Sequence, residues 1–322
     1  MKESLLVAIG GNALLRAGEK GTISEQIANA GRVAQNIAEL AERGFRLILT
    51  HGNGPQVGSQ LLRSESGSSQ TYVLPLDVCV AMTQGEIGYI LGLAIQKALF
   101  ERGLSIPVAS LITKILVDED DEAFQHPTKP IGPFYSEHAA LQKQREFGWN
   151  IIEDAARGYR RVVPSPAPID VLESEIIRKC MDEDMIVIAG GGGGVPVIRK
   201  NGEIIGIEAV IDKDRASALI ANRLHIKRII ISTDVEWVSL NFKKSGESPI
   251  QRMNIPIAKK LLCEGHFLEG SMKPKIEASI QFLEHGGEEV IITNPEHMVS
   301  ALEGTSGTHI IKEILYEHAP HY

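Results

Sequence analysis

The sequence predicts an α/β protein in which helices cover both faces of a largely parallel sheet of about eight strands. The alternation of two kinds of segment predicts this fold. Short apolar runs, typical of buried strands, alternate with longer segments of helical periodicity along the chain. Alternation of this kind favours a parallel sheet between two layers of helices.

Length, charge and cysteine content limit the possible classes of protein. The 322 residues can form one large domain or two lobes with a substantial core. The net charge of −8 argues against a general role in binding nucleic acid or a membrane surface. The three cysteines lie far apart without a Cys-x-x-Cys pair, so neither a disulfide framework nor zinc is indicated.

Targeting signals are not apparent in the sequence. No stretch approaches the apolar length of a membrane span. The first apolar run is interrupted by glycines too early for the core of a signal peptide. We therefore expect a soluble, cytoplasmic protein.

The first strand is expected at residues 5–9, and it runs directly into a loop of two glycines and an asparagine at 10–12. Thr22 and Glu25 form a capping-box pattern, which predicts that a helix begins there. Apolar residues then recur at helical spacing until Gly44, a residue typical of a helix end.

The second strand, at 47–49, ends in a similar loop, Gly52–Asn53–Gly54. Pro55 suits the first turn of a following helix. A strand that leads through glycines into a helix N-terminus can hold an anion, because backbone N–H groups approach it closely. Two Gly–Asn loops at the ends of two strands therefore predict one anion site built from both sides. A second long helix is expected from Pro75 to Arg102.

Later segments continue the alternation. The dipeptide Asn201–Gly202 stands between two short apolar runs and predicts a tight hairpin. Helices are expected at 216–222 and 276–285. Further buried strands are expected at 106–112, 185–189, 227–232 and 289–292.

Two regions interrupt the alternation. Residues 118–168 are polar and contain six prolines, which predicts a lid or an inserted subdomain. Lys129 lies between prolines in this insertion, so a stiff arm displays its charge. Residues 240–256 predict an exposed hairpin or loop.

A run of five glycines, Gly190–Gly194, follows an expected strand. Such a run costs conformational entropy, so it predicts a close approach of the backbone to another group. A tight turn packed against a neighbouring strand is the alternative. The spacing does not fit the dinucleotide-binding fingerprint.

Two further lysines stand at expected helix starts. Asp212 is a typical helix cap, whereas Lys213 beside it is unfavourable at a helix N-terminus unless it binds an anion. Lys275 precedes the helix expected at 276–285, where a polyphosphate could bind. Alternatively, each lysine is a solvated surface residue. His51 could act as a general base or orient its glycine loop.

Taken together, the motifs resemble those of carbamate kinases in the amino-acid kinase superfamily, in order and over nearly the whole chain. The resemblance implies an open αβα sandwich with a protruding subdomain, a homodimer, and reversible phosphoryl transfer between ATP and carbamate. The matching segments are VAIGGNALL at 7–15, THGNGPQVG at 50–58, PLDVCVAMTQGEIGY at 75–89, PTKPIGPF at 127–134, RVVPSP at 161–166, AGGGGGVPV at 189–197, EAVIDKD at 208–214 and HFLEGSMKPKIEA at 266–278.

The resemblance also implies roles for individual residues. It implies a substrate lobe at 1–210 that includes the lid at 118–168, and a nucleotide-binding lobe at 211–322. The implied catalytic residues are Lys129, Lys213, Lys275 and Asp214. Carbamate would be surrounded by Gly10, Gly11, Asn12, Gly52 and Asn53. The nucleotide would contact Gly191, Gly192, Lys213, Thr233, Asp234, Met272 and Lys275.

Phosphoryl transfer to carbamate requires positioning and charge neutralisation, and the anionic acceptor needs no general base. Mg²⁺ would accompany ATP or ADP, and no protein ligand for the metal is indicated. The first strand ends in Val7–Ala8–Ile9, without the lysine that many superfamily members have there, so the resemblance makes Lys129 the expected substitute. The resemblance further implies ATP synthesis from carbamoyl phosphate in arginine or related nitrogen catabolism.

The sequence departs from the family pattern at two places. Ala167 replaces a lysine that many members have in the segment after RVVPSP, and Glu236–Trp237 alters the segment after Thr233–Asp234. If these changes remodel the pocket, the chain is a superfamily kinase for another small acid. A catalytically silent nucleotide-binding regulator is a further alternative.

Overall fold

The computed structural model describes residues 2–16, 18–153, 158–243, 245–268 and 270–312. Its centre is an eight-stranded sheet in the order β15-β17-β16-β12-β1-β2-β9-β3. All neighbouring strands are parallel except β16 and β17. The predicted α/β fold is therefore confirmed. The strands are β1 (Ser4–Ile9), β2 (Arg46–His51), β3 (Val108–Ser110), β9 (Ile186–Ile188), β12 (Arg228–Ser232), β15 (Arg252–Asn254), β16 (Glu289–Thr293) and β17 (Thr308–Ile311).

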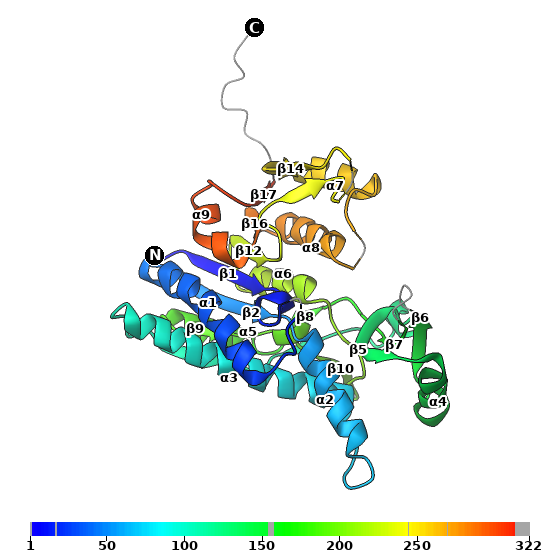
Figure 1. The fold of residues 1–322 in the computed structure, drawn as a ribbon. Coiled ribbons are helices and arrows are strands. Elements are labelled where there is room, and N and C mark those ends of the chain that lie inside the picture. Colours follow the sequence, from blue (N-terminus) through cyan, green and yellow to red (C-terminus); the bar gives the residue numbers. More distant parts are fainter. Residues whose placement is uncertain (1, 17, 154–157, 244, 269, 313–322) are drawn as a thin grey trace.

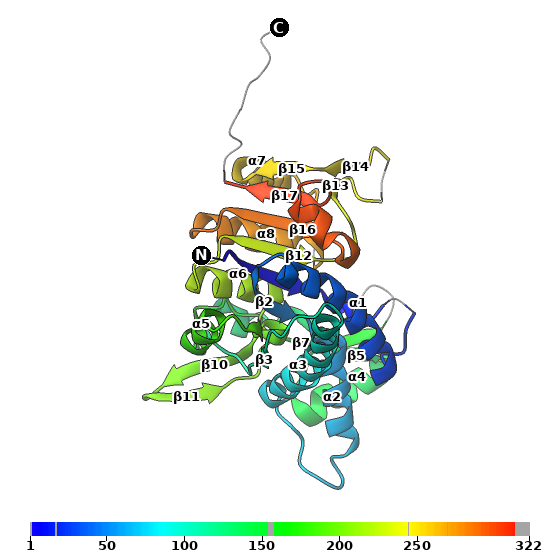
Figure 2. The ribbon, with the colours of Figure 1, turned by 90° about the vertical axis from the view of Figure 1, so that its left-hand side faces the viewer.

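Six of these strands coincide with predicted ones, whereas β15 and β17 were not predicted. The hairpin predicted at Asn201–Gly202 forms between β10 (Val195–Lys200) and β11 (Glu203–Gly206), and both turn residues have positive φ, at 52° and 84°. It belongs to a second sheet, in the order β11-β10-β4-β8, and projects from the body in Figure 2. The other strands of this sheet are β4 (Lys114–Leu116) and β8 (Asp170–Val171).

Helices cover both faces of the main sheet (Figure 1). Alternate residues of β1 face opposite layers: Leu5 and Val7 pack with α1, α3 and α9, whereas Leu6 packs with α5 to α8. The predicted capping box at Thr22 begins α1. The helices are α1 (Ile23–Glu42), α3 (Leu76–Glu101), α5 (Ser174–Asp182), α6 (Lys213–Arg223), α7 (Ile255–Cys263), α8 (Met272–Glu284) and α9 (Met298–Leu302).

Helix α3 corrects the expectation that no stretch approaches the length of a membrane span. By length and composition alone, this 26-residue helix is apolar enough to cross a membrane. Its most apolar window is half buried inside the protein, where Ile87, Leu91 and Ile95 pack against the main sheet. Its remaining apolar side chains include Tyr89 and Leu93, which are exposed.

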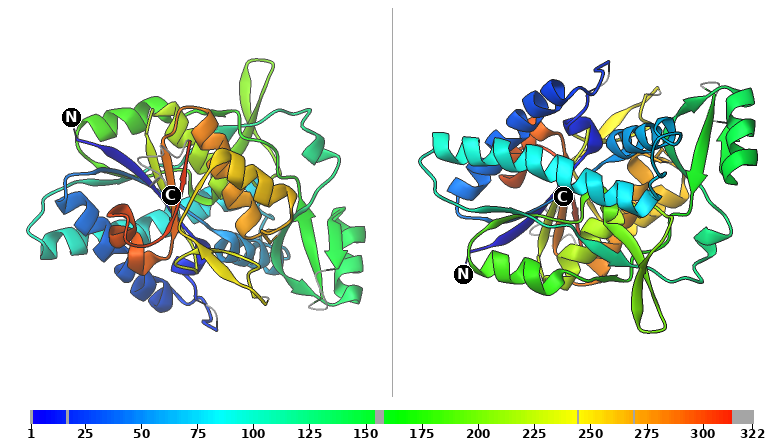
Figure 3. Two further views of the ribbon diagram at one scale, coloured as in Figure 1. Left: turned by 90° about the horizontal axis from the view of Figure 1, so that it is seen from above. Right: turned by 90° about the horizontal axis from the view of Figure 1, so that it is seen from below.

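Part of the predicted insertion forms an arm that projects from the body, as Figures 1 and 3 show. The arm consists of β5 (Lys129–Tyr135), α4 (Glu137–Phe147), β6 (Asn150–Glu153) and β7 (Tyr159–Val163), with its three strands in the order β5-β7-β6. Its base is not separate from the body, because Ile131 and Val163 share a core cluster with Val57 and Val80. Helix α2 (Gly54–Ser66) forms the facing surface, and its Gly58 lies against Gly132 of the arm.

The second irregular region, expected at 240–256, overlaps a two-stranded antiparallel hairpin of β13 (Val238–Leu240) and β14 (Ser248–Ile250), which begins two residues earlier. Strand β15 and the start of α7 also lie in it. Short 3₁₀ helices occur at η1 (Gly11–Ala13), η2 (Glu122–Phe124), η3 (Gly191–Gly193) and η4 (Pro295–His297).

Candidate active site

The candidate site lies where the strand order of the main sheet changes direction. Strand β1 has β12 on one side and β2 on the other, so their carboxyl ends meet at one edge. Crevices at such points bind ligands in open α/β sheets. The two predicted Gly–Asn loops meet here: a Cβ on Gly52 would lie 3.0 Å from the backbone nitrogen of Gly11. A Cβ on Gly10 would lie 2.7 Å from the carbonyl oxygen of Ser232, so packing of the loops requires glycine at both positions.

A cavity of about 340 Å³ opens between these loops, the arm and the starts of α6 and α8. It brings together most of the predicted substrate and catalytic residues. Gly10 and Gly191 are not among its lining residues, and the side chain of Asn12 lies outside the described part of the structure. The predicted residues that line it are Gly11, Gly52, Asn53, Lys129, Gly192, Lys213, Asp214 and Lys275.

Asp214 joins two lysines at the floor of this cavity. Its Oδ1 lies 2.9 Å from Nζ of Lys213, and its Oδ2 accepts a hydrogen bond of 3.1 Å from Nζ of Lys275. The three side chains are only 13%, 5% and 15% exposed, for Lys213, Asp214 and Lys275 respectively. Such burial requires mutual compensation of charge, and the cluster has one cation more than anions.

Burial determines the electrostatics of this cluster. Burial of the Lys213 ammonium lowers its pKa, although Asp214 opposes the shift. Burial alone would raise the pKa of Asp214, but Lys213 and Lys275 together hold it well below its ordinary value. Asp214 is therefore a carboxylate at any physiological pH and fixes both lysines.

The starts of two helices place the lysines. Asp212 caps α6, as predicted, by accepting hydrogen bonds from the backbone nitrogens of Asp214 and Arg215. Helix α8 begins at Met272, four residues earlier than expected, so that Lys275 lies within its first turn. Both lysines thus stand at helix N-termini, where partial positive charge makes a cation unfavourable and an anionic ligand favourable.

The third predicted catalytic lysine comes from the arm. Nζ of Lys129 donates a hydrogen bond of 2.8 Å to Oδ2 of Asp212. Arg160 of β7 also lines the cavity, and its Nη2 donates to the carbonyl of Gly132. Arg160 could not be selected from the sequence, because the pairing of β5 with β7 that brings it to the cavity is not a local pattern.

The glycine run makes the predicted close approach, and its partners are side chains and backbone of the protein. A Cβ on Gly191 would lie 2.2 Å from Nε2 of His51, and one on Gly192 would lie 2.2 Å from Nδ2 of Asn53. A Cβ on Gly193 would lie 2.1 Å from the carbonyl oxygen of Ile211. The run therefore leaves room for residues of the β2 loop. Of its five glycines, only Gly192 lines the cavity of about 340 Å³, called the anion cavity below.

His51 orients its loop. The imidazole is buried beneath the glycine run, and its Nδ1 lies 3.0 Å from the carbonyl oxygen of Gly52. Burial lowers the pKa of His51 to about 4, and nearby Lys213 contributes to this shift. The ring is therefore neutral at physiological pH, with Nδ1 as the hydrogen-bond donor to Gly52. This arrangement favours the loop-orienting interpretation over a general base.

Buried polar residues next to the cavity hold its loops through hydrogen bonds. Asn53 donates to Thr83 on α3, and the hydroxyls of Thr50 and Ser217 lie 2.7 Å apart. The side-chain amide of Gln84 donates through Nε2 to the carbonyl oxygen of Thr113 and accepts through Oε1 from its backbone nitrogen, and the Thr113 hydroxyl accepts from the backbone nitrogen of Gly190. Sequence reasoning selected Asn53 but missed its supporting partners Thr83, Gln84 and Thr113, because a buried polar side chain has no distinctive local pattern.

A second cavity, of about 290 Å³, adjoins the first through Ser271. It contains the predicted nucleotide residues Thr233, Asp234 and Met272. The departure from the family pattern also lies here, since Trp237 contributes to the wall together with Phe242. Its aromatic and apolar lining beside the lysine cluster suits a nucleobase next to its phosphates.

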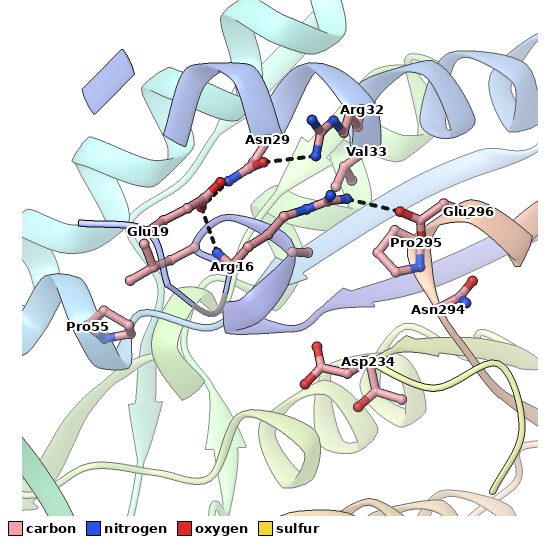
Figure 4. A pocket seen from close by; sticks show the side chains of 13 residues that line it. Arg16, Glu19, Asn29, Arg32, Val33, Pro55, Asp234, Asn294, Pro295 and Glu296 are labelled. Atoms are coloured by element: carbon pink, nitrogen blue, oxygen red, sulfur yellow. Dashed lines mark hydrogen bonds and ion pairs between the residues drawn. The ribbon is translucent and has the colours of Figure 1, made fainter. Parts of the chain in front are cut away.

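A third cavity, of about 530 Å³, shares Thr233 and Asp234 with the second (Figure 4). Arg16 crosses it to Glu296 at 3.1 Å. Asn29 donates to Glu19, whose carboxylate also accepts from the backbone nitrogen of Arg16. These bonds tie the chain after the first glycine loop to α1 and to η4.

The described residues contain no group of three or more His, Cys, Asp or Glu that could hold a metal ion. Asp212 and Asp214 both have lysine partners. A magnesium ion coordinated mainly by nucleotide phosphates fits this set, because Mg²⁺ typically uses only one or two protein carboxylates in phosphoryl-transfer sites.

Comparison with known proteins gives concordant matches. The model of the amino acid kinase family matches residues 3–294. The carbamate kinase of Thermococcus kodakarensis is 46% identical over 313 residues, which cover 96% of this chain and 99% of the relative. The carbamate kinase-like protein YahI of Escherichia coli is 43% identical, with 97% and 100% covered. The structure of Giardia lamblia carbamate kinase bound to AMP-PNP superposes with a TM-score of 0.91 at 38% identity, covering 97% of this chain and 99% of that one.

Proposed function

We propose, from the premise that the chain belongs to the amino acid kinase family and is an enzyme of the carbamate kinase type, that it interconverts ATP plus carbamate with ADP plus carbamoyl phosphate. The observation that carries this proposal is the cluster of Lys213, Asp214 and Lys275, which Lys129 approaches from the arm. Three ammonium groups around a cavity of about 340 Å³ suit a small phosphorylated acid.

The proposed chemistry is direct transfer. Towards ATP, an oxygen of the ADP β-phosphate attacks the phosphorus of carbamoyl phosphate. The bond between phosphorus and the carbamoyl oxygen breaks, and carbamate leaves with the electron pair. Lys213 and Lys275 neutralise the oxygens of the transferred group, and backbone N–H groups at Gly11 and Gly52 orient it. No proton has to be removed from either nucleophile, which agrees with a neutral, buried His51.

We propose that Mg²⁺ enters as part of the nucleotide substrate, and that it offsets the charge of the phosphates when bound. The nucleobase would occupy the cavity beside Trp237 and Phe242, and Thr233 and Asp234 would border the ribose or base. From the resemblance to carbamate kinases, we propose that ATP synthesis from carbamoyl phosphate is the main direction of the reaction. We place this reaction in the cytoplasm and in arginine or related nitrogen catabolism.

We also propose a homodimer through the exposed apolar faces of α1 and α3. Ile23, Ile27, Tyr89 and Leu93 are 50%, 49%, 66% and 48% exposed, and they flank a groove of about 590 Å³. Adjoining apolar side chains of this extent are typical of protein interfaces. Light scattering after size exclusion should give twice the chain mass, and Leu93→Lys should give a monomer. A monomeric parent protein would contradict this proposal.

The test of the function is ATP formation from ADP, Mg²⁺ and carbamoyl phosphate, detected by luciferase with carbamoyl phosphate omitted as the control. We expect ATP only in the complete mixture, and no ADP from ATP with acetylglutamate or aspartate. Turnover on another acid, without turnover on carbamoyl phosphate, would assign the chain to the alternative small-acid kinase. Absence of turnover on every acid would favour a silent regulator.

A further inference from the structure

Lys129 has a protein partner inside the candidate site. Its ammonium binds Oδ2 of Asp212 at 2.8 Å, across the boundary between the arm and the body. The Asp212 side chain is only 15% exposed, and both residues line the anion cavity. In the described structure, the charge of Lys129 is therefore directed at a carboxylate on the wall of the cavity.

Asp212 has a second role through its other oxygen. Oδ1 accepts from the backbone nitrogens of Asp214 at 2.9 Å and Arg215 at 3.3 Å, which caps helix α6. One carboxylate thus connects the arm lysine to the first turn that carries Lys213 and Asp214. Movement of the arm would separate Lys129 from this turn.

We propose that Asp212 is a positioning residue, which holds the arm in its closed position and keeps Lys129 at the cavity before the substrate arrives. This inference rests on the proposed carbamoyl phosphate activity. A lysine ammonium has three donors, and Asp212 uses one of them, so the others remain available to a phosphoryl oxygen. Asp212 acts through Lys129 and does not itself touch the transferred group.

A positioning role predicts a specific kinetic pattern. If the arm is closed in only a fraction of molecules, the apparent affinity for substrate equals the intrinsic affinity multiplied by that fraction. A saturating anion can itself draw Lys129 in, so kcat is largely retained. Loss of the cap, by contrast, would displace Lys213 and Asp214 and lower kcat.

The variant Asp212→Asn separates the two roles, because asparagine caps helices as well as aspartate does but carries no charge. We expect KM for carbamoyl phosphate to rise about tenfold while kcat stays within about twofold. Asp212→Ser should behave similarly, because serine also caps helices. It provides the same test if Asp212→Asn is unstable. Asp121→Asn is the matched control, because Asp121 caps η2 and does not line the cavity.

A double-mutant cycle tests whether Asp212 acts through Lys129. Lys129→Met should lower kcat/KM at least about a hundredfold, and adding Asp212→Asn should have no further effect. Multiplicative effects of the two substitutions, or a fall in kcat with an unchanged KM, would overturn the proposal.

Hydrogen–deuterium exchange gives a readout that does not depend on activity. Without substrates, peptides that cover β5 should exchange faster in Asp212→Asn than in the parent protein. Unchanged exchange there would overturn the positioning role even if the enzyme is active. A parent protein without activity on carbamoyl phosphate, but with faster β5 exchange in the variant, would overturn the proposed function alone.

Discussion

The candidate site has two halves that are built differently. In the body, Lys213 and Lys275 are nearly buried and are fixed by one carboxylate at two helix starts. In the arm, Lys129 is 36% exposed and lies on a strand of a projecting three-stranded sheet. The body half resists rearrangement because separating its buried charges is costly. The Lys129 side chain is more exposed, so we expect its separation from Asp212 to cost less.

This difference separates two requirements of phosphoryl transfer. Charge neutralisation is most effective when the charges are fixed before the reaction. Entry and release of substrate require that some part of the site opens. The body supplies fixed charge, and under the proposal made above the arm supplies a charge that Asp212 holds at the cavity.

The largest expected effect tests the buried half. Asp214→Asn keeps the shape of the side chain but leaves two buried ammonium groups without their carboxylate. We expect a loss of about 3–5 kcal/mol in the free energy of unfolding, measured by urea denaturation, together with loss of activity. Glu277→Gln is the matched control, because its pair with Arg215 is more than a third exposed and should contribute less than about 1 kcal/mol. Equal effects of the two variants would contradict the difference in burial.

Lys213→Met tests whether the buried lysines serve chemistry. Removing one preorganised charge should lower kcat at least about a hundredfold, which corresponds to about 3 kcal/mol of transition-state stabilisation. The protein should remain folded, because methionine fills a similar volume. Lys260→Met, on the exposed side of α7, provides the control. Near-normal kcat in Lys213→Met would show that this lysine has only a structural role.

The pH dependence of the unfolding free energy tests the buried half of the site through His51. Its pKa is about 4 in the folded protein, against 6.5 for an unperturbed histidine, so the unfolded chain binds the proton more tightly. Stability is therefore complete above pH 6.5 and falls as the pH drops towards 4, by about 3 kcal/mol. In His51→Asn this part of the acid dependence should be absent. Parallel curves of unfolding free energy against pH for the two proteins would contradict the prediction.

The smallest expected effect tests the arm. Nζ of Lys143 on α4 lies 2.6 Å from Glu65 of α2 and 5.0–5.6 Å from the ring centroids of Tyr135, Phe147 and Trp149. Lys143→Met removes this contact and should cost about 1–2 kcal/mol.

The same variant should raise KM for carbamoyl phosphate severalfold without changing kcat, as expected for a residue that holds the arm on the body. Adding Glu65→Gln, which removes the carboxylate left without a partner, should recover part of the stability. A large fall in kcat in Lys143→Met would show that the two halves are not separable.

Elements that depend on neighbouring residues could be predicted from the sequence. The capping box at Thr22 and the hairpin at Asn201–Gly202 each involve groups within a few residues of one another. Strands β15 and β17 were missed because they are short, and because their positions in the sheet depend on pairing across more than 50 residues.

The candidate site was partly predictable, because several of its residues lie in short local motifs. The structure brings Lys129, Lys213, Asp214 and Lys275 to one cavity, and their catalytic roles remain predictions. The partner of Lys129 could not be predicted, because 83 residues separate it from Asp212. The glycine run indicated a close approach, but only the folded chain identifies His51 and Asn53 as its partners.

Helix α3 has a consequence while the chain is being synthesised. It ends at residue 101, whereas β9, whose Ile186 and Ile188 share its core cluster, ends at residue 188. At 5–20 residues per second, the ribosome needs roughly 4–17 seconds to make the intervening chain. During that interval a helix with the length and composition of a membrane span can be covered by α1, α2 and the strands already made, but not by β9. Docking of α1 and α2 on α3 before β9 is made would cover part of this apolar surface early.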